Sequence, residues 1–191
     1  SRLPGKVLAK INNTPAISIL ISRLKNCCEI DDVVVATSNS PLDDELAEYL
    51  KKTNTLFFRG SENDVLQRVV DTAGYFDAET IVEINGDCIL TDFNVVDSAV
   101  QIFNKGNYDV VTNCGENLSY PMGIYAQVFS LKSLSYVAKN IFESEVREHV
   151  SLYFYDNPQT YKIFNMIAPK SISFPDWRLH LDYVEDLEFL N

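Results

Sequence analysis

Short apolar runs alternate with longer amphipathic segments along the first part of the chain. Four runs are too short for helices, are bounded by polar turn residues and predict buried strands: 31–39, 54–60, 79–87 and 108–113. Four longer segments carry apolar residues at helical spacing and predict helices: 14–26, 41–52, 62–76 and 93–105. Pro41 and Asp92 stand where helices commonly begin. Strands separated by helices of this length predict an α/β fold, with a mostly parallel sheet sandwiched by helices.

The pattern is less regular after residue 114. Three more strands are predicted, the last of them running into a final helix: 123–130, 160–168 and 178–182. Two more helices are predicted between the first two of these strands: 131–142, which Ser130 caps, and 143–155. No repeat or linker interrupts the sequence, so we expect a single domain over 1–191, with the loop at 114–123 as the start of a small excursion.

Composition narrows the class of protein. The chain is 46% hydrophobic and 23% charged, which are values of a folded globular domain. Its net charge of −11 argues against a surface for nucleic acid, although a nucleotide needs only a few local cations. No apolar run reaches the roughly 20 residues of a membrane span. Its four cysteines form no C-x-x-C pair and predict free thiols in a cytoplasmic protein: Cys27, Cys28, Cys88 and Cys114.

Candidate chemistry lies where predicted strands end, because parallel sheets bind ligands beyond the carboxyl ends of their strands. Thr37 and Ser38 follow one strand, and Arg59 ends the next. Asp87 follows Gly86 after the third strand, and a carboxylate there suits a hard divalent cation. The alternative for Asp87 is an ordinary Asn-Gly-Asp turn.

Three other groups have an ordinary structural alternative. Arg2 and Lys6 flank a Pro-Gly turn that could hold a phosphate, or could belong to a solvated terminus. Asp182 ends the closing strand, but its spacing to Glu185 is that of a helix capping box. The segment "REHV" could offer metal ligands, but one histidine beside glutamates is more typical of a polar helix face. The sequence contains no Walker A or G-x-G-x-x-G motif.

Seven segments in order along the chain resemble the SpsF-type cytidylyltransferase family, relatives of the CMP-KDO and CMP-sialic acid synthetases. These segments are "SRLPGK", "VVVATSN", "FRGSENDVLQR", "EINGDCIL", "YPMGIYAQVFS", "REHVSLY" and "LDYVEDLEFL". The resemblance implies a Rossmann-like fold of the nucleotide-diphospho-sugar transferase type. It also implies a reaction in which an acidic sugar attacks the α-phosphate of CTP, with Mg²⁺ required, giving a CMP-sugar for polysaccharide biosynthesis and pyrophosphate.

The same resemblance assigns roles to residues. Arg2, Lys6 and Asp87 would be catalytic, and Asp87 and Asp182 would hold Mg²⁺. The nucleotide would be bound by a larger set: Arg2, Lys6, Thr37, Ser38, Arg59 and Asp87. The sugar would be bound by four residues: Tyr120, Gln127, Glu148 and His149. The resemblance also implies a homodimer formed through 115–160, a first strand that precedes Ser1, and a last helix that continues beyond Asn191.

Two alternatives to a cytidylyltransferase stay open at this point. A glycosyltransferase of similar architecture would use a nucleotide-sugar, but such enzymes commonly carry a D-x-D motif and none is found here. The second alternative is a non-catalytic nucleotide-binding module of the same fold. Family members often have acidic residues where this chain has Met122, Tyr125 and Gln127, which leaves the acceptor sugar open.

Overall fold

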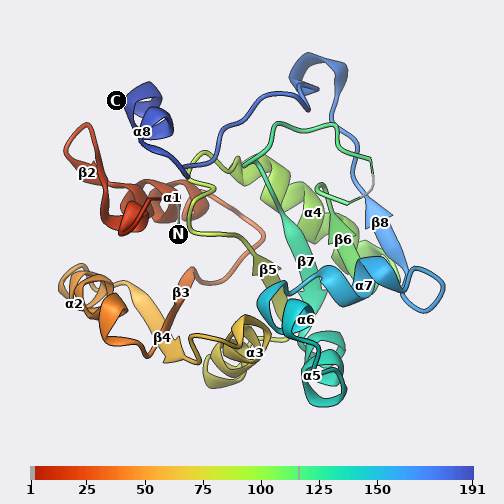
Figure 1. Cartoon of the computed structure of the whole chain (residues 1–191). Helices are drawn as coiled ribbons and strands as arrows, with labels where there is room; N and C mark the ends of the chain where they lie inside the picture. The colour runs from red at the N-terminus through yellow and green to blue at the C-terminus, as the bar shows by residue number, and fades with distance from the viewer. Residues whose placement is uncertain (1–2, 116) are drawn as a thin grey trace.

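The centre of the domain is a set of strands flanked by helices on both sides (Figure 1). The computed structural model describes residues 3–115 and 117–191. Two strands form a parallel pair: β3 (Val34–Ser38) and β4 (Leu56–Gly60). Four strands form a sheet in the order β5 (Thr80–Glu83), β7 (Gln127–Ser130), β6 (Val110–Thr112) and β8 (Ile163–Asn165). Within this sheet β7 runs antiparallel to both neighbours, whereas β6 and β8 are parallel. The predicted α/β class is confirmed, with one reversed strand.

Eight α-helices connect and cover these strands in the described part of the chain. They are α1 (Ala16–Leu24), α2 (Asp44–Lys52), α3 (Val65–Tyr75), α4 (Phe93–Lys105), α5 (Leu131–Asn140), α6 (Ser144–Glu148), α7 (Leu152–Asp156) and α8 (Val184–Leu190). Three short 3-10 turns accompany them: η1 (Lys6–Leu8), η2 (Pro41–Asp43) and η3 (Lys170–Ile172). The side chains of Asp92 and Ser130 accept hydrogen bonds from the first turns of α4 and α5, which confirms both predicted caps. No helix in the described ranges is long and apolar enough to cross a membrane.

A groove of about 460 Å³ lies between the β3–β4 pair and the four-stranded sheet. In the described residues β3 pairs with β4 alone and β5 pairs with β7 alone, so the facing edges of β3 and β5 have no strand between them. The groove runs along both edges, with apolar side chains of α1 on one side and of α3 on the other. Val7, which follows Lys6 in η1, also lines it.

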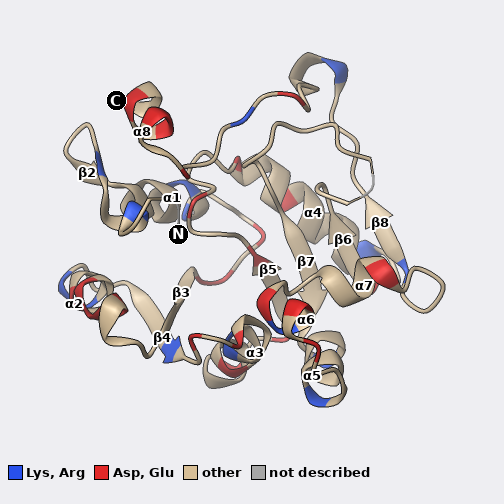
Figure 2. Ribbon diagram, in the orientation of Figure 1, with Lys and Arg blue, Asp and Glu red and all other residues tan. Residues whose placement is uncertain are grey.

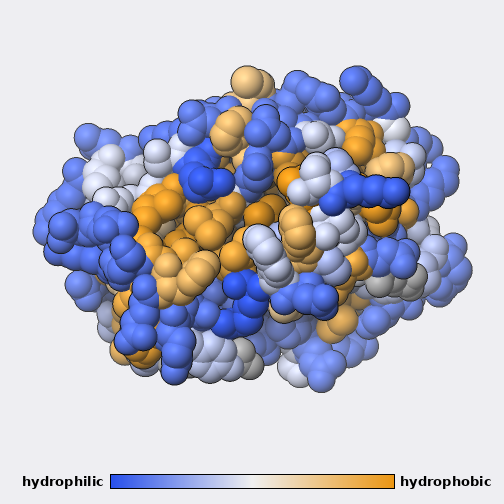
Figure 3. Space-filling view, turned by 90° about the horizontal axis from the view of Figure 1, so that it is seen from above, coloured by the Kyte–Doolittle hydropathy of each residue, from blue (hydrophilic) through white to orange (hydrophobic). Residues whose placement is uncertain are grey.

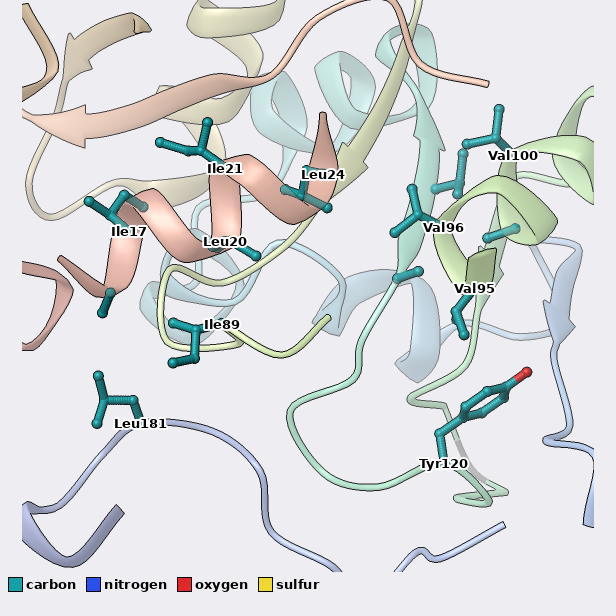
Figure 4. Close-up of a cluster of buried hydrophobic side chains, with 14 of the residues drawn as sticks. Ile17, Leu20, Ile21, Leu24, Ile89, Val95, Val96, Val100, Tyr120 and Leu181 are labelled. Carbon is teal, nitrogen blue, oxygen red and sulfur yellow. The ribbon is translucent and has the colours of Figure 1, made fainter. Parts of the chain in front are cut away.

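Apolar side chains form two clusters. The larger cluster joins α1 and α4 with Ile89, Leu181 and Tyr120 (Figure 4). The smaller one places Phe129 of β7 and Phe154 of α7 beneath α3 and α5, with their rings 5.3 Å apart. Residues 115–160, expected to form a dimerisation excursion, therefore contribute a middle strand and part of the core. Whether they also contact a second copy of the chain stays a prediction.

Three predicted elements differ from the structure. The predicted helix over 143–155 is broken into α6 and α7, because His149 has extended backbone (φ −114°, ψ 99°). The predicted strand at 178–182 does not join a sheet and makes one isolated bridge, from Arg178 to Met122. The first helix begins two residues later than predicted, because Thr14 and Pro15 form strand β2 of a hairpin with β1 (Lys10–Ile11).

Surface character follows the composition. Figure 2 shows aspartate and glutamate on α2, α6 and α8, in keeping with the net charge of −11. The space-filling view of one face shows a patch of hydrophobic residues bordered by hydrophilic ones (Figure 3).

Candidate active site

Lys6 lies at the centre of the candidate site. Gly5 precedes it with left-handed backbone (φ 68°), as the Pro-Gly pair predicts, and the amide of Leu8 donates to the Gly5 carbonyl at 2.9 Å. The Lys6 ammonium donates to Asp87 Oδ2 at 2.5 Å and to Asp182 Oδ1 at 2.7 Å. Three predicted site residues, which are 81 and 95 positions apart along the chain, therefore meet in one cluster.

This cluster is largely shielded from water. The side chains of Lys6, Asp87 and Asp182 are 19%, 23% and 17% exposed. Burial alone lowers the pKa of Lys6, but hydrogen bonds from its ammonium to Asp182 and Asp87 outweigh this and raise the pKa above its ordinary value. The hydrogen bond from Lys6 holds the pKa of Asp182 below its usual range. Lys6 and Asp182 are thus charged near neutral pH.

Asp182 is held from several sides. Its Oδ2 lies 3.1 Å from His180 Nε2 and 3.6 Å from Arg178 Nη2. The Leu181 amide donates to the Asp87 carbonyl at 2.9 Å, which ties the two carboxylate-bearing segments together. Sequence analysis missed Arg178 and His180, although alternation along an extended segment places them on the same face as Asp182.

The predicted capping box at Asp182 and Glu185 is wrong by one residue. Helix α8 is capped by Tyr183, and its capping-box partner is Asp186. The Asp186 carboxylate accepts hydrogen bonds from the amides of Asp182 and Tyr183 and pairs with Arg178. The Asp182 side chain is therefore not the helix cap, so capping does not account for an aspartate at this position.

The donor set fits a hard divalent cation. Two carboxylate oxygens approach one positively charged atom, so Asp87 and Asp182 can face a single cation. Mg²⁺ is often bound through one or two carboxylates, with water and substrate phosphates completing its shell. Among the residues that the structure describes, no group of three or more His, Cys, Asp or Glu could hold a metal by protein ligands alone.

The residues predicted to bind the nucleotide base have structural partners. Asp43, which sequence analysis missed, accepts from the hydroxyls of Thr37 (2.9 Å) and Ser38 (2.5 Å). Arg59 donates to the carbonyls of Ser38 and Ser40, both at 2.8 Å, and thereby ties β4 to the turn before α2. Their hydroxyls and guanidinium are engaged within the protein, and contact with a base stays a prediction.

The four residues predicted to bind the sugar do not come together at Lys6. Tyr120 is buried in the larger cluster near Val95 of α4 (Figure 4). Gln127 is buried and both ends of its amide are engaged by other side chains. Glu148 and His149 are exposed at the end of α6, and no side-chain bond joins them to the Lys6 cluster in the described ranges. Their sugar-binding roles stay predictions.

Gln127 belongs to a buried polar chain that sequence analysis missed. Its Nε2 donates to Glu83 at 2.7 Å, and Tyr155 donates to its Oε1 at 2.6 Å. Burial, and secondarily the nearby Asp87, raise the pKa of Glu83 to about 7, although the hydrogen bond from Gln127 opposes the shift. This chain connects the end of β5, just before Asp87, to β7 and α7.

Two arginines belong to the segments "REHV" and "SRLPGK" that the sequence analysis singled out. Arg147 of "REHV" pairs with Asp64 and donates to the carbonyl of Ala138, so it fixes α6 against α3 and α5. Arg2, predicted to contact phosphate, lies outside the described residues.

Comparison with known proteins places the chain in a family. Residues 1–187 match the family described as Cytidylyltransferase. The chain is 31% identical to the spore coat polysaccharide biosynthesis protein SpsF of Bacillus subtilis, over 98% of this chain and 79% of that protein. Its fold is similar to a cytidylyltransferase from Leptospira borgpetersenii, with a TM-score of 0.91 and 32% identity over 100% of this chain and 79% of that one.

A more distant structure shares the fold alone. A CMP:2-keto-3-deoxy-manno-octonic acid synthetase complexed with CTP has a TM-score of 0.69 and 16% identity, covering 100% of this chain and 91% of that one. The predicted Rossmann-like fold and the resemblance to the SpsF type are confirmed. The chain belongs to the cytidylyltransferase family.

Proposed function

We propose that the protein transfers CMP from CTP to an acidic sugar, releasing pyrophosphate, for polysaccharide or glycan biosynthesis. The observation that carries this proposal is the meeting of Lys6, Asp87 and Asp182 beside the end of β5. A cation and two carboxylates at that edge suit a triphosphate with its divalent ion. Family membership supports CTP as the nucleotide, and the distant synthetase of acidic sugars supports the acceptor class.

Positioning and charge would supply most of the rate in such a transfer. The Lys6 ammonium, together with Arg2, would neutralise phosphate oxygens of CTP as negative charge grows on the leaving pyrophosphate. Asp87 and Asp182 would hold Mg²⁺, which when bound neutralises phosphate charge and orients the triphosphate. His180 and Arg178 would keep the Asp182 carboxylate turned toward that position.

The rival functions differ in what they bind. A glycosyltransferase would require a nucleotide-sugar instead of CTP, and family membership disfavours it. A non-catalytic module would bind CTP, or nothing, without turnover. We also propose a cytoplasmic location, which the four free cysteines support.

The deciding experiment measures pyrophosphate release from the protein with Mg²⁺ and a panel of acidic and neutral sugars. Release is expected with CTP and an acidic sugar, and not with UTP or ATP. Asp87→Asn and Asp182→Asn each remove one carboxylate charge and should lower the rate by about a hundredfold or more, by analogy with lost electrostatic stabilisation. Both should melt within a few degrees of the parent.

The matched control is Asp92→Asn, since asparagine caps a helix about as well as aspartate and Asp92 caps α4 away from Lys6. This variant should keep full activity. Full activity of Asp182→Asn across a Mg²⁺ titration would remove the two-carboxylate site. Absence of CTP binding by calorimetry would exclude the proposed reaction altogether.

A further inference from the structure

Lys6 occupies the position that the two carboxylates define. Its nitrogen lies within 2.7 Å of an oxygen of both Asp87 and Asp182. A divalent cation held by those same oxygens would have to stand where this ammonium stands. Two positive groups cannot share so small a space, because their repulsion is strong where water is largely excluded. The ammonium and the metal are therefore alternative occupants.

The carboxylates are fixed and the lysine is the part that can leave. The Asp87 segment is tied to Leu181 by a backbone hydrogen bond of 2.9 Å, and the backbone of Asp182 is held by Asp186 at 2.8 Å. Lys6, in contrast, reaches the site through a flexible four-carbon side chain with a compact charged end. Rotation of that side chain vacates the position without moving either carboxylate.

Among the residues that the structure describes, Lys6 has no carboxylate partner other than Asp87 and Asp182 to which its ammonium could move. In the described residues its ammonium makes ion pairs with Asp87 and Asp182 alone. If a metal displaced it with nothing else present, a partly buried ammonium would lose both partners, which is costly. A triphosphate supplies new anionic partners for the ammonium at the same time as it supplies oxygen ligands for the metal.

We propose that Lys6 is an exchangeable counter-ion, which holds Asp87 and Asp182 together without a metal and releases them to a divalent cation only when a nucleoside triphosphate takes over the ammonium. This inference rests on the proposed function and deepens it. Metal binding then depends on nucleotide binding, and Lys6 is the residue that couples the two.

The test measures Mn²⁺ binding to the nucleotide-free protein by electron paramagnetic resonance. Lys6→Met keeps an unbranched side chain, one atom shorter than lysine, and removes its charge. The variant should bind Mn²⁺ more tightly than the parent, on the order of tenfold, because the position between the two carboxylates loses the ammonium that occupies it. Lys10→Met removes an exposed lysine four residues away and should leave Mn²⁺ affinity unchanged.

The parent protein gives a second readout that needs no variant. With ¹⁵N-lysine labelling, the Lys6 ammonium resonance should persist when Mg²⁺ alone is added and shift when CTP and Mg²⁺ are added together. A shift with Mg²⁺ alone would overturn the proposal. Equal Mn²⁺ affinity in parent and Lys6→Met would overturn the exchange while leaving the metal site intact. Absence of Mn²⁺ binding in every protein, with or without CTP, would overturn the metal site and the exchange together.

Discussion

Polar side chains near the strand ends divide into two kinds. Asp43 and Arg59 use their hydrogen-bonding groups to hold loops and strand ends together, whereas Lys6 and Asp182 face one another across a small space. Sequence patterns indicate Arg59, Lys6 and Asp182 alike as candidates for ligand binding, without distinguishing the two kinds. The two kinds differ in whether neighbouring residues already satisfy the hydrogen-bonding groups of the side chain. That depends on contacts between segments that are distant in the sequence.

Glu83 provides a prediction for pH dependence. Its pKa is raised from 4.5 to about 7 in the folded protein, chiefly by burial. Between these pH values Glu83 holds more protons in the folded state than in the unfolded state, so its contribution to stability is greatest below about pH 4.5 and falls as the pH rises to about 7. Because Glu83 is only half-buried at the border of the groove, we expect an effect of about 2 kcal/mol.

Glu83→Gln should remove this dependence. Glutamine can still accept the hydrogen bond from Gln127 but cannot ionise, so urea unfolding at pH 8 should show it to be more stable than the parent. At pH 4.5 the two proteins should unfold alike. The control is Glu79→Gln, which changes an exposed glutamate one residue before β5 and should leave the profile of the parent unchanged. Parallel profiles for parent and Glu83→Gln between pH 4.5 and 8 would contradict this account.

At the scale of elements, periodicity predicted the helices and strands of the first half with small errors at their ends. The hairpin of β1 and β2 was missed because it turns on Asn12 and Asn13, both with positive φ, and its strands have two residues each. The break at His149 was missed because apolar positions continue through it at four-residue spacing. The segment 178–182 is extended, as its alternation indicates, but it bonds to loops that no local pattern could identify.

The facing edges of β3 and β5 predict what fills the groove between them. The chain at Leu3–Leu8 lies at the carboxyl end of β5, where Lys6 meets Asp87. A strand upstream of Ser1 that ran through the groove would end near this point, parallel to β5, with α1 in the following crossover. If residues precede Ser1 in the natural protein, we therefore expect them to form this strand.

Burying one strand of apolar side chains in the groove should stabilise the fold by several kcal/mol and raise the melting temperature by about 10 °C or more. Calorimetric melting of residues 1–191 with and without the upstream residues measures this difference. A proline in the middle of the added segment removes an amide donor and should cancel much of the gain. Equal melting temperatures with and without the segment would show that the strand boundary is misplaced.

At the scale of the whole molecule, polar and acidic surface surrounds a smaller apolar area. Large hydrophobic side chains remain more than half exposed in and beside 115–160: Tyr136, Phe142, Ile167 and Trp177. The Trp177 ring stacks on Phe174 at 4.4 Å between centroids. Apart from Tyr136, the apolar residues in α5, α6 and α7 are buried or half-buried within the domain, so the apolar surface open to a partner is smaller than the sequence indicated.

We expect the protein to be a homodimer that covers part of this surface. Light scattering at high micromolar concentration should give twice the mass of one chain. Trp177→Ala should shift the equilibrium toward the monomer, because an exposed aromatic ring is a strong contact in an interface. Leu42→Ala, which changes an exposed leucine beside α2, should not. A monomer at the highest concentration would remove the expectation.

The backbone of Met122 pairs with the extended segment at 177–179, and this pairing has a consequence for the evolution of specificity for the acceptor sugar. The amide of Met122 donates to the carbonyl of Trp177, and the amide of Leu179 donates to that of Met122. At Gly123, with φ 97°, a Cβ atom would stand 2.6 Å from the amide nitrogen of His180. If this loop contacts the acceptor sugar, then insertions that change the acceptor would also displace Asp182, the carboxylate proposed to hold Mg²⁺. Specificity for a new acceptor sugar can therefore evolve most easily through side-chain changes that leave this backbone pairing intact.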